Sequence, residues 1–266
     1  YAYAGKELEK YRRYFERFPP CAWRGPTFVR DSLVEADGAF CPDSLHKVYD
    51  VQVIKSDYLI RNIDQAFEVW RGQPWGRNVA FADFLEFILP YRVGTETLAD
   101  WRQEVYDRYN PMLDSIRASA DSTDVLAVAQ ALMDSLSVGT VYFTGLFPSG
   151  ITVGPDLVVW RSGNCRELTD LVTYVFRALG IPGGCDKMLM RGDKNVAHYW
   201  NFVVDGEDST YFASIGQSSK QFAKADTYWD PKGKVYRETF SLNRTMRDAC
   251  GRDTADVPPV FREPLM

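Results

Sequence analysis

Two residues of this chain could act together as a nucleophile and its base, Cys165 and His198. Cys165 stands in the stretch SGNCRELTDLVTYVFRALGIP, directly before apolar residues that recur at helical spacing. His198, one of two histidines in the chain, follows in VAHYWNFVVD. A thiol and an imidazole that meet in space can cleave an amide through a covalent thioester, because the imidazole takes up the thiol proton and later returns it.

The run after Cys165 predicts a helix that ends at Gly180 and Pro182. Cys165 then lies in the first turn, where free backbone N–H groups and the helix dipole favour an anion. The pKa of a thiol can fall there from about 8.5 to roughly 3.5–7.5, so we expect a reactive thiolate. Gly163 is expected to let the backbone and a substrate approach closely. The apolar stripe of this helix contains Leu168, Val172, Val175 and Leu179.

His198 is predicted to lie near the start of a strand. Side chains on a strand alternate between its two faces, so His198 shares its face with apolar residues. We expect this face to pack on the cysteine helix and to bring the imidazole to the N-terminus of that helix. His46, in FCPDSLHKVYD, is expected to be a loop or surface residue. The residues on the same face as His198 are Val196, Trp200, Phe202 and Val204.

The elements that must position these two residues divide into a helical part and a part rich in strands. Helical spacing dominates from Gly5 to about Ser137, whereas the segments after the cysteine helix are extended and are separated by GDKN, DGED and DPKG, which favour hairpin turns. We therefore predict a helical region at 1–150 and a core of helix plus antiparallel sheet at 151–266. No repeat or long linker separates them, which predicts one compact α+β unit with the helical layer packed on the core.

The composition excludes several classes of protein. The chain has 266 residues, 45% of them hydrophobic, which is enough for a well-packed core. A net charge of −5 argues against nucleic acid or an anionic membrane as a partner, and no apolar run is long enough to span a membrane. The chain begins with Tyr1, so we expect a piece processed or cut from a longer protein.

The five cysteines are neither dense nor regular enough for a disulfide framework or a CxxC zinc site. Two histidines and no cysteine cluster with ligand spacing imply no metal and no cofactor. Cys185 is predicted to be a core thiol. Cys21 and Cys41 flank an aromatic loop region and could either form a disulfide in an oxidising compartment or stay free.

The run GNCRELTDLVTYVFRALGIP, followed after a strand by AHYWNFVVDG, resembles the core of the transglutaminase-like superfamily. Papain-like members of that superfamily carry G-x-C on a helix, R-A-x-G-I-P at its end and H-x-W on a later element. The resemblance covers roughly residues 158–216, and FADFLEFILPYRVGTETLADWR is reminiscent of accessory helices in bacterial, often secreted members. It implies a papain-like fold in which Cys165 is the nucleophile and His198 the general base.

The chain departs from the family at the third catalytic residue, which is usually an Asp on the strand after the histidine. A tight turn at DGED places Ile215 opposite His198, and a shift of that turn by one or two residues places Ser214 or Ala213 there. None of these is a carboxylate. Ser214 falls nearest the expected position and could orient the imidazole only weakly. A Cys–His dyad, an acid from elsewhere in the chain and a lapsed enzyme therefore all remain open.

From these residues we predict a thiol-dependent hydrolase of amide bonds, of the peptidase or amidase type, with Cys165, His198 and Ser214 at its site. Its partner would be a peptide, protein or glycopeptide substrate. One alternative is a transamidating crosslinker, which forms the same thioester but transfers it to an amine instead of water. Another is a catalytically lapsed module that binds peptide or glycan. The resemblance to bacterial members implies a secreted, periplasmic or cell-surface location.

Overall fold

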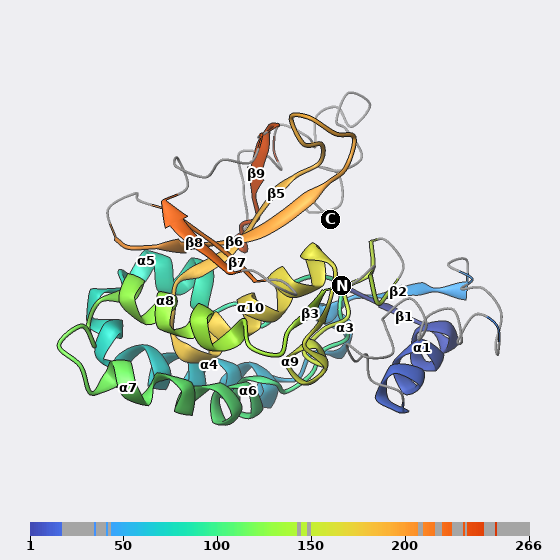
Figure 1. Ribbon diagram of the computed structural model, residues 1–266. Coiled ribbons are helices and arrows are strands. Elements are labelled where there is room, and N and C mark those ends of the chain that lie inside the picture. Colours follow the sequence, from blue (N-terminus) through green and yellow to red (C-terminus); the bar gives the residue numbers. More distant parts are fainter. Residues whose placement is uncertain are drawn as a thin grey trace.

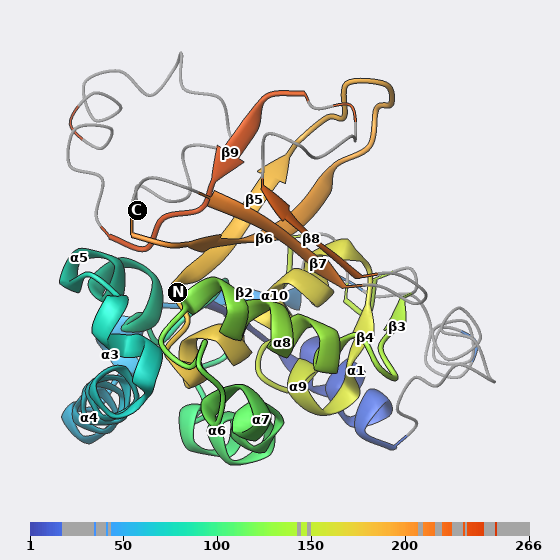
Figure 2. The ribbon, with the colours of Figure 1, turned by 60° about the vertical axis from the view of Figure 1, so that its left-hand side comes forward.

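The computed structural model describes residues 1–17, 35, 41, 44–142, 145–147, 150–206, 210–215, 220–224, 231, 233–241 and 248. An antiparallel sheet covers one side of a layer of helices, and α10 (Cys165–Leu179) runs between the two (Figure 1). The turned view in Figure 2 shows β6 (His198–Val204) above α10, with α4 (Ser56–Gly72) and α6 (Arg102–Tyr109) below. This mixture of helices and antiparallel strands is an α+β architecture, as predicted.

The helical layer comes from the first half of the chain, where the sequence periodicity predicts it. The helical run that begins with α6 is interrupted at Pro111, because proline cannot donate the next helical hydrogen bond. The chain continues there as η4 (Asn110–Leu113) and α7 (Asp114–Arg117). The other helical elements are α1 (Lys6–Arg17), α3 (Asp50–Val53), η2 (Pro74–Asn78), α5 (Phe81–Asp83), η3 (Phe84–Ile88), α8 (Val125–Leu136) and α9 (Leu157–Trp160).

The strands of the main sheet lie in the order β8-β7-β6-β5-β9, and each neighbouring pair is antiparallel, as predicted. Nothing in the sequence pattern predicts β8 (Lys220–Lys224). Two short pairs lie outside this sheet: β1 (Ala2–Ala4) is antiparallel to β2 (His46–Val48), and β3 (Val141–Tyr142) is parallel to β4 (Ser162–Gly163). The remaining strands are β5 (Gly183–Met188), β7 (Thr210–Ile215) and β9 (Val235–Arg237).

α10 begins at Cys165 because Asn164 caps it. The Asn164 side chain accepts hydrogen bonds from the backbone N–H groups of Arg166 and Glu167, and Glu167 Oε2 accepts one from the Asn164 N–H at 2.8 Å. Gly180 ends the helix with a φ of 73°, which glycine adopts without strain. The predicted start and end of this helix are both confirmed.

The packing surrounds α10 on several sides. Its predicted apolar stripe is buried, and one continuous hydrophobic cluster extends from Tyr11 to Ile215 with α10 residues among its members. Both halves of the chain therefore contribute to one core, while the boundary at residue 150 stays a prediction. The spacing of Leu59, Ile63, Phe67 and Trp70 predicts one apolar face on α4. The structure instead buries Asn62 and Ala66, whereas Ile63 is 41% exposed.

Candidate active site

Cys165 lies at the junction of α10 and β6. The thiol is partly buried, and the backbone N–H of Tyr199 lies near enough to the sulfur to favour a negative charge on it. Tyr199 follows His198 directly in β6, so the start of that strand lies beside the first residue of α10. The fold thus brings the candidate nucleophile next to the strand segment that bears the candidate base.

The protonation of Cys165 differs from the expectation. Burial raises the pKa of the Cys165 thiol above its ordinary value, and the nearby Glu167 carboxylate adds to the rise. The N–H groups of Tyr199 and Arg166 oppose it but do not reverse it. The prediction of a thiol with a lowered pKa is wrong, because loss of hydration outweighs the helix N-terminus. The resting group is a protonated thiol near neutral pH.

His198 is the first residue of β6 and pairs with Met188 of β5. Its ring lies 5.6 Å from the Trp200 ring, between centroids, at an interplanar angle of 37°. Asn201, on the other face of the strand, donates from Nδ2 to Thr169 O at 2.9 Å and to Thr173 Oγ1 at 3.0 Å, both in α10.

These contacts correct the predicted packing of β6. Alternation puts Tyr199, Asn201 and Val203 on the α10 side, and His198 with Trp200 on the opposite side. Trp200 and Met188 form a small buried cluster of their own there. The face of His198 therefore does not pack on α10. The direct pairing of thiol and imidazole stays a prediction.

The third predicted residue, Ser214, is displaced by the observed register. Val204 pairs with Thr210 and Asn201 with Ala213, so the connection is longer than the two-residue turn assumed at DGED. Carried one pair further, this register puts Ser214 opposite Trp200, and position 216, opposite His198, lies outside the described residues. The prediction that Ala213, Ser214 or Ile215 lies opposite His198 is therefore wrong. Ser214 still shares the face of the imidazole, two positions along, and its role there stays a prediction.

Sequence reasoning missed Tyr142. Tyr142 pairs with Gly163 in the β3–β4 ladder, and its hydroxyl lies near Cys165. Burial and the nearby Cys165 and Glu167 raise the pKa of this phenol. No local motif signals this contact, because it joins segments far apart in the sequence.

Gly163 and Glu167 hold the loop in front of the helix. Gly163 has a φ of 148°, and a Cβ there would stand 2.4 Å from the Glu167 Cβ. Glu167 is 5% exposed and its Oε1 accepts a hydrogen bond from Leu146 N at 2.8 Å, while burial raises the pKa of its carboxyl. Gly163 therefore admits the Glu167 side chain, and the close approach of a substrate at Gly163 stays a prediction.

Charged residues tie the first two turns of α10 to the sheet. Arg166 donates from Nε to Asp170 Oδ2 at 3.1 Å and from Nη1 to Glu238 Oε1 at 2.9 Å. Lys187 Nζ lies 2.8 Å from the same Glu238 oxygen, and the Arg166 guanidinium lies 5.1 Å from the centre of the Tyr199 ring. This network holds Tyr199 against the first turn of α10, so that the Tyr199 backbone N–H lies near the candidate thiol.

The other candidates from the sequence lie apart from this site. Cys185 is 1% exposed and is a core thiol, as predicted. His46 is exposed on β2, and Cys41 has a free, exposed thiol, whereas Cys21 lies outside the described residues. Within the described part of the chain, no three His, Cys, Asp or Glu residues are grouped to hold a metal ion, and no helix is long and apolar enough to cross a membrane.

No protein-family model matches the chain, and no match was found among curated proteins. Among solved structures, it is similar to the crystal structure of the periplasmic domain of TgpA from Pseudomonas aeruginosa bound to ethylmercury, with 16% sequence identity and a TM-score of 0.31. The match covers 54% of this chain and 48% of that one, so the chain spans about half the length of the TgpA structure. A likeness this slight establishes neither fold nor chemistry, and the transglutaminase-like resemblance depends on the residues of the chain itself.

Proposed function

We propose that the protein is a thiol-dependent amide hydrolase of the transglutaminase-like type, acting on a peptide, protein or glycopeptide. The observation that supports this most is the packing of the start of β6 on the first turn of α10, where the Arg166 guanidinium lies 5.1 Å from the centre of the Tyr199 ring. Arg166 follows the candidate nucleophile in sequence, and Tyr199 follows the candidate base. The helix start, the strand and the ion-pair network converge at this point from three separate segments. A location outside the cytoplasm is part of the proposal and depends on the family resemblance.

In the proposed reaction the Cys165 sulfur attacks the amide carbonyl carbon as its proton passes to His198. The carbonyl oxygen becomes an oxyanion, the C–N bond then breaks, and His198 returns the proton to the leaving amine. Water, deprotonated by His198, attacks the thioester and releases the acid and the free thiol. The raised pKa of the Cys165 thiol is the reason for giving His198 the role of general base during attack in this proposal.

The backbone N–H of Cys165 is the proposed donor to the oxyanion. The Tyr142 hydroxyl, which lies near Cys165, is proposed as a second donor. Ser214, on the same face as His198, is proposed to orient the imidazole as a neutral partner. A neutral partner stabilises an imidazolium less than a carboxylate does, so turnover is expected to be slow.

The raised pKa of the thiol also favours a second candidate, a lapsed module that binds peptide or glycan without cleaving it. The two candidates differ in one covalent species. A hydrolase forms a thioester at Cys165 with the acyl part of its substrate, and a binding module does not.

The test is incubation with a library of peptide amides, followed by intact-protein and peptide mass spectrometry. We expect an acyl adduct on Cys165 in the wild type, none in Cys165→Ala, and loss of turnover in His198→Ala. Cys41→Ala is the matched control, because it removes an exposed free thiol away from the site. Absence of both adduct and turnover in the folded wild type would reject the hydrolase and leave the binding module.

A further inference from the structure

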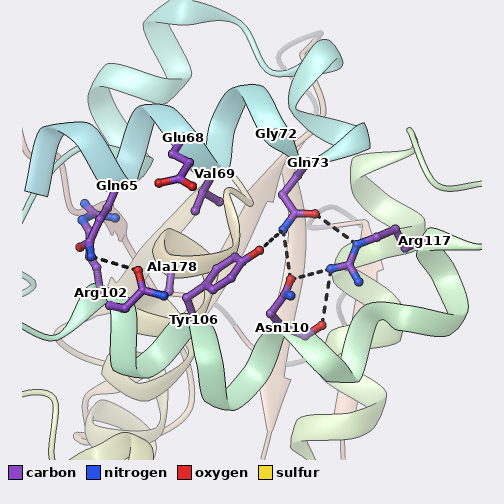
Figure 3. Close-up of a pocket in the computed structure, with 11 residues that line it drawn as sticks. Gln65, Glu68, Val69, Gly72, Gln73, Arg102, Tyr106, Asn110, Arg117 and Ala178 are labelled. Carbon is purple, nitrogen blue, oxygen red and sulfur yellow. Dashed lines mark hydrogen bonds between the residues drawn. The ribbon is translucent and has the colours of Figure 1, made fainter.

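A polar cavity of about 420 Å³ lies between α4 and α6, at the C-terminal end of α10 and so at the opposite end of that helix from Cys165 (Figure 3). Val69 and Ala178 form apolar patches in its wall, and most of the remaining lining is polar. A volume of this size is within the range of small-ligand sites, and it can enclose a single small molecule.

Both ends of the cavity are closed by hydrogen bonds between the two helices. At one end Gln65 Nε2 donates to Gln103 Oε1 at 3.1 Å. At the other, Gln73 Nε2 donates to the Tyr106 hydroxyl at 3.3 Å and to Asn110 Oδ1 at 3.1 Å. A chain-like ligand that runs along the helices would meet these bridges, so the cavity suits a compact ligand.

The wall at the second end is held in place before any ligand arrives. Gln73 is 5% exposed, and its Oε1 accepts from Arg117 Nε at 3.3 Å. Arg117 Nη2 also donates to Asn110 Oδ1 at 2.5 Å. Side chains held in this way lose little conformational freedom when a ligand binds, so the entropic cost of binding is small.

The charges around the cavity disfavour ionic ligands of either sign. Arg102 is 4% exposed and donates to the backbone carbonyls of Ile88, Leu89 and Pro90, and Arg117 pairs with Asp114, so neither guanidinium is open to an anion. The Glu68 carboxylate on the rim repels an anion as well. The Arg102 charge, which has no carboxylate partner within the described residues, disfavours a cation.

The hydrogen-bonding capacity that remains includes both donors and acceptors. Gln65 Oε1 is buried without a donor, and within the described residues the Glu68 carboxylate makes no hydrogen bond or ion pair. The Tyr106 hydroxyl and the Asn110 amide have protons with no acceptor there. Hydroxyl groups satisfy both kinds of partner because each donates one proton and accepts through its oxygen.

We propose that this cavity binds an uncharged, polyhydroxylated ring, one sugar unit in size. Planar amide and carboxylate groups bind its hydroxyls, and the Tyr106 ring covers its apolar C–H face. The site is separate from Cys165 and does not depend on the proposed hydrolase.

The test is titration of the whole chain with D-glucose, D-galactose and N-acetyl-D-glucosamine, followed by NMR of the side-chain amides. Binding of a single sugar is expected at about millimolar strength. At least one sugar should shift the signals of Gln65, Gln73 and Asn110 together. Gln65→Leu should weaken binding about tenfold, since it removes a buried acceptor, and Tyr106→Phe, which removes only a hydroxyl, should weaken it severalfold.

Gln130→Leu is the matched control, because Gln130 on α8 makes a similar bond from its amide to Asp134 at 2.9 Å, outside the cavity. Binding in this variant should equal that of the wild type. The proposal is overturned if no sugar shifts these signals, if putrescine or acetate binds in place of the sugars, or if Tyr106→Phe binds as well as the control. Tyr106→Phe keeps the test decisive even if Gln65→Leu fails to fold.

Discussion

The two ends of α10 bury charge in different ways. At the N-terminal end, Arg166 lies between the carboxylates of Asp170 and Glu238. At the C-terminal end, Arg177 is fully buried and bonds to backbone carbonyls, with Nε to Phe87 O at 3.1 Å and Nη1 to Arg92 O at 2.6 Å. One end neutralises a cation with acids, and the other surrounds a cation with backbone carbonyls and the Phe240 ring, whose centre lies 4.0 Å from the guanidinium.

This difference gives the two ends different roles. The C-terminal end of α10 is structural, and the N-terminal end bears on the candidate site. The carbonyls around Arg177 belong to η3 and to the segment after it. Arg102 donates to the same Pro90 carbonyl, so the two guanidiniums hold this segment against the helical layer. Glu238, whose pKa Arg166 and Lys187 hold below its ordinary value against the effect of burial, neutralises the cation next to Cys165 in sequence, and Asp170 adds to this only once it ionises, near pH 7. The N-terminal end therefore holds the thiol in place without presenting it with an excess of positive charge, and this agrees with a thiol pKa that is raised.

The largest effect is expected at the C-terminal end, from Arg177→Met. The substitution leaves at least two buried carbonyls without their donor, at about 1–3 kcal/mol each, so the free energy of unfolding should fall by about 3–5 kcal/mol. Urea unfolding measures it. Arg108→Met is the control, since Arg108 is 45% exposed and should contribute at most about 0.5 kcal/mol. Equal losses in the two variants would contradict the structural role of Arg177.

A pH-dependent effect is expected at the N-terminal end, from Asp170→Asn. Burial raises the pKa of Asp170 to about 7, against the pull of Arg166 and with a further rise from Glu238 and Glu96. Between about pH 4 and pH 7 the unfolded chain has lost the proton that the folded protein keeps. The contribution of Asp170 to stability is therefore complete below pH 4 and declines as the pH rises through this window, by on the order of 2–4 kcal/mol.

Asn cannot titrate, so the stability of Asp170→Asn should lack this decline. The measurement is the free energy of unfolding of both proteins at several pH values, with the wild-type curve falling relative to the variant from pH 4 to pH 7. Asp100→Asn removes one partner of the exposed ion pair with Arg61. Its free energy of unfolding should change with pH in parallel with that of the wild type. Parallel curves for Asp170→Asn as well would mean that the Asp170 carboxyl is ionised in the folded protein throughout.

The features that could be predicted from the sequence depend on local chemistry. Cys165 lies at the first position of its helix because Asn164 and Glu167 cap that turn, and Gly180 ends the helix four turns later in the same continuous run. Antiparallel strands after it follow from Asp, Asn and Gly between extended segments. Such signals lie within a few residues of their effect and need no knowledge of the fold.

The features that were missed depend on partners distant in sequence. The face of His198 was assigned from its apolar neighbours, but Asn201 is the residue that meets α10, because Thr169 and Thr173 satisfy its buried amide. Ile63 was expected on the apolar face of α4, yet Asn62 is buried, since Arg102 and the Leu89 carbonyl bond to it. A buried polar residue with its partners can replace an apolar one, and periodicity alone cannot show this.

The smallest effect is expected from Glu238→Gln, and it bears most directly on the candidate site. Glu238 bonds to both Arg166 and Lys187, so its loss should lower the free energy of unfolding by about 1–3 kcal/mol. It also leaves the two cations less neutralised. The pKa of the Cys165 thiol should fall as a result, and alkylation of Cys165 at neutral pH should become about two- to fivefold faster.

Iodoacetamide labelling across a pH series, with each cysteine resolved by peptide mass spectrometry, separates this charge effect from simple loosening of the fold. A fall in thiol pKa shifts the rate profile of Cys165 to lower pH and leaves the labelling of the core thiol Cys185 slow. Loosening would instead speed both thiols without shifting the profile, because exposure increases access at every pH. Glu104→Gln, at an exposed position on α6, should change neither rate. An unshifted Cys165 profile in folded Glu238→Gln would show that the acids at this end of α10 hold the helix without setting the reactivity of its first residue.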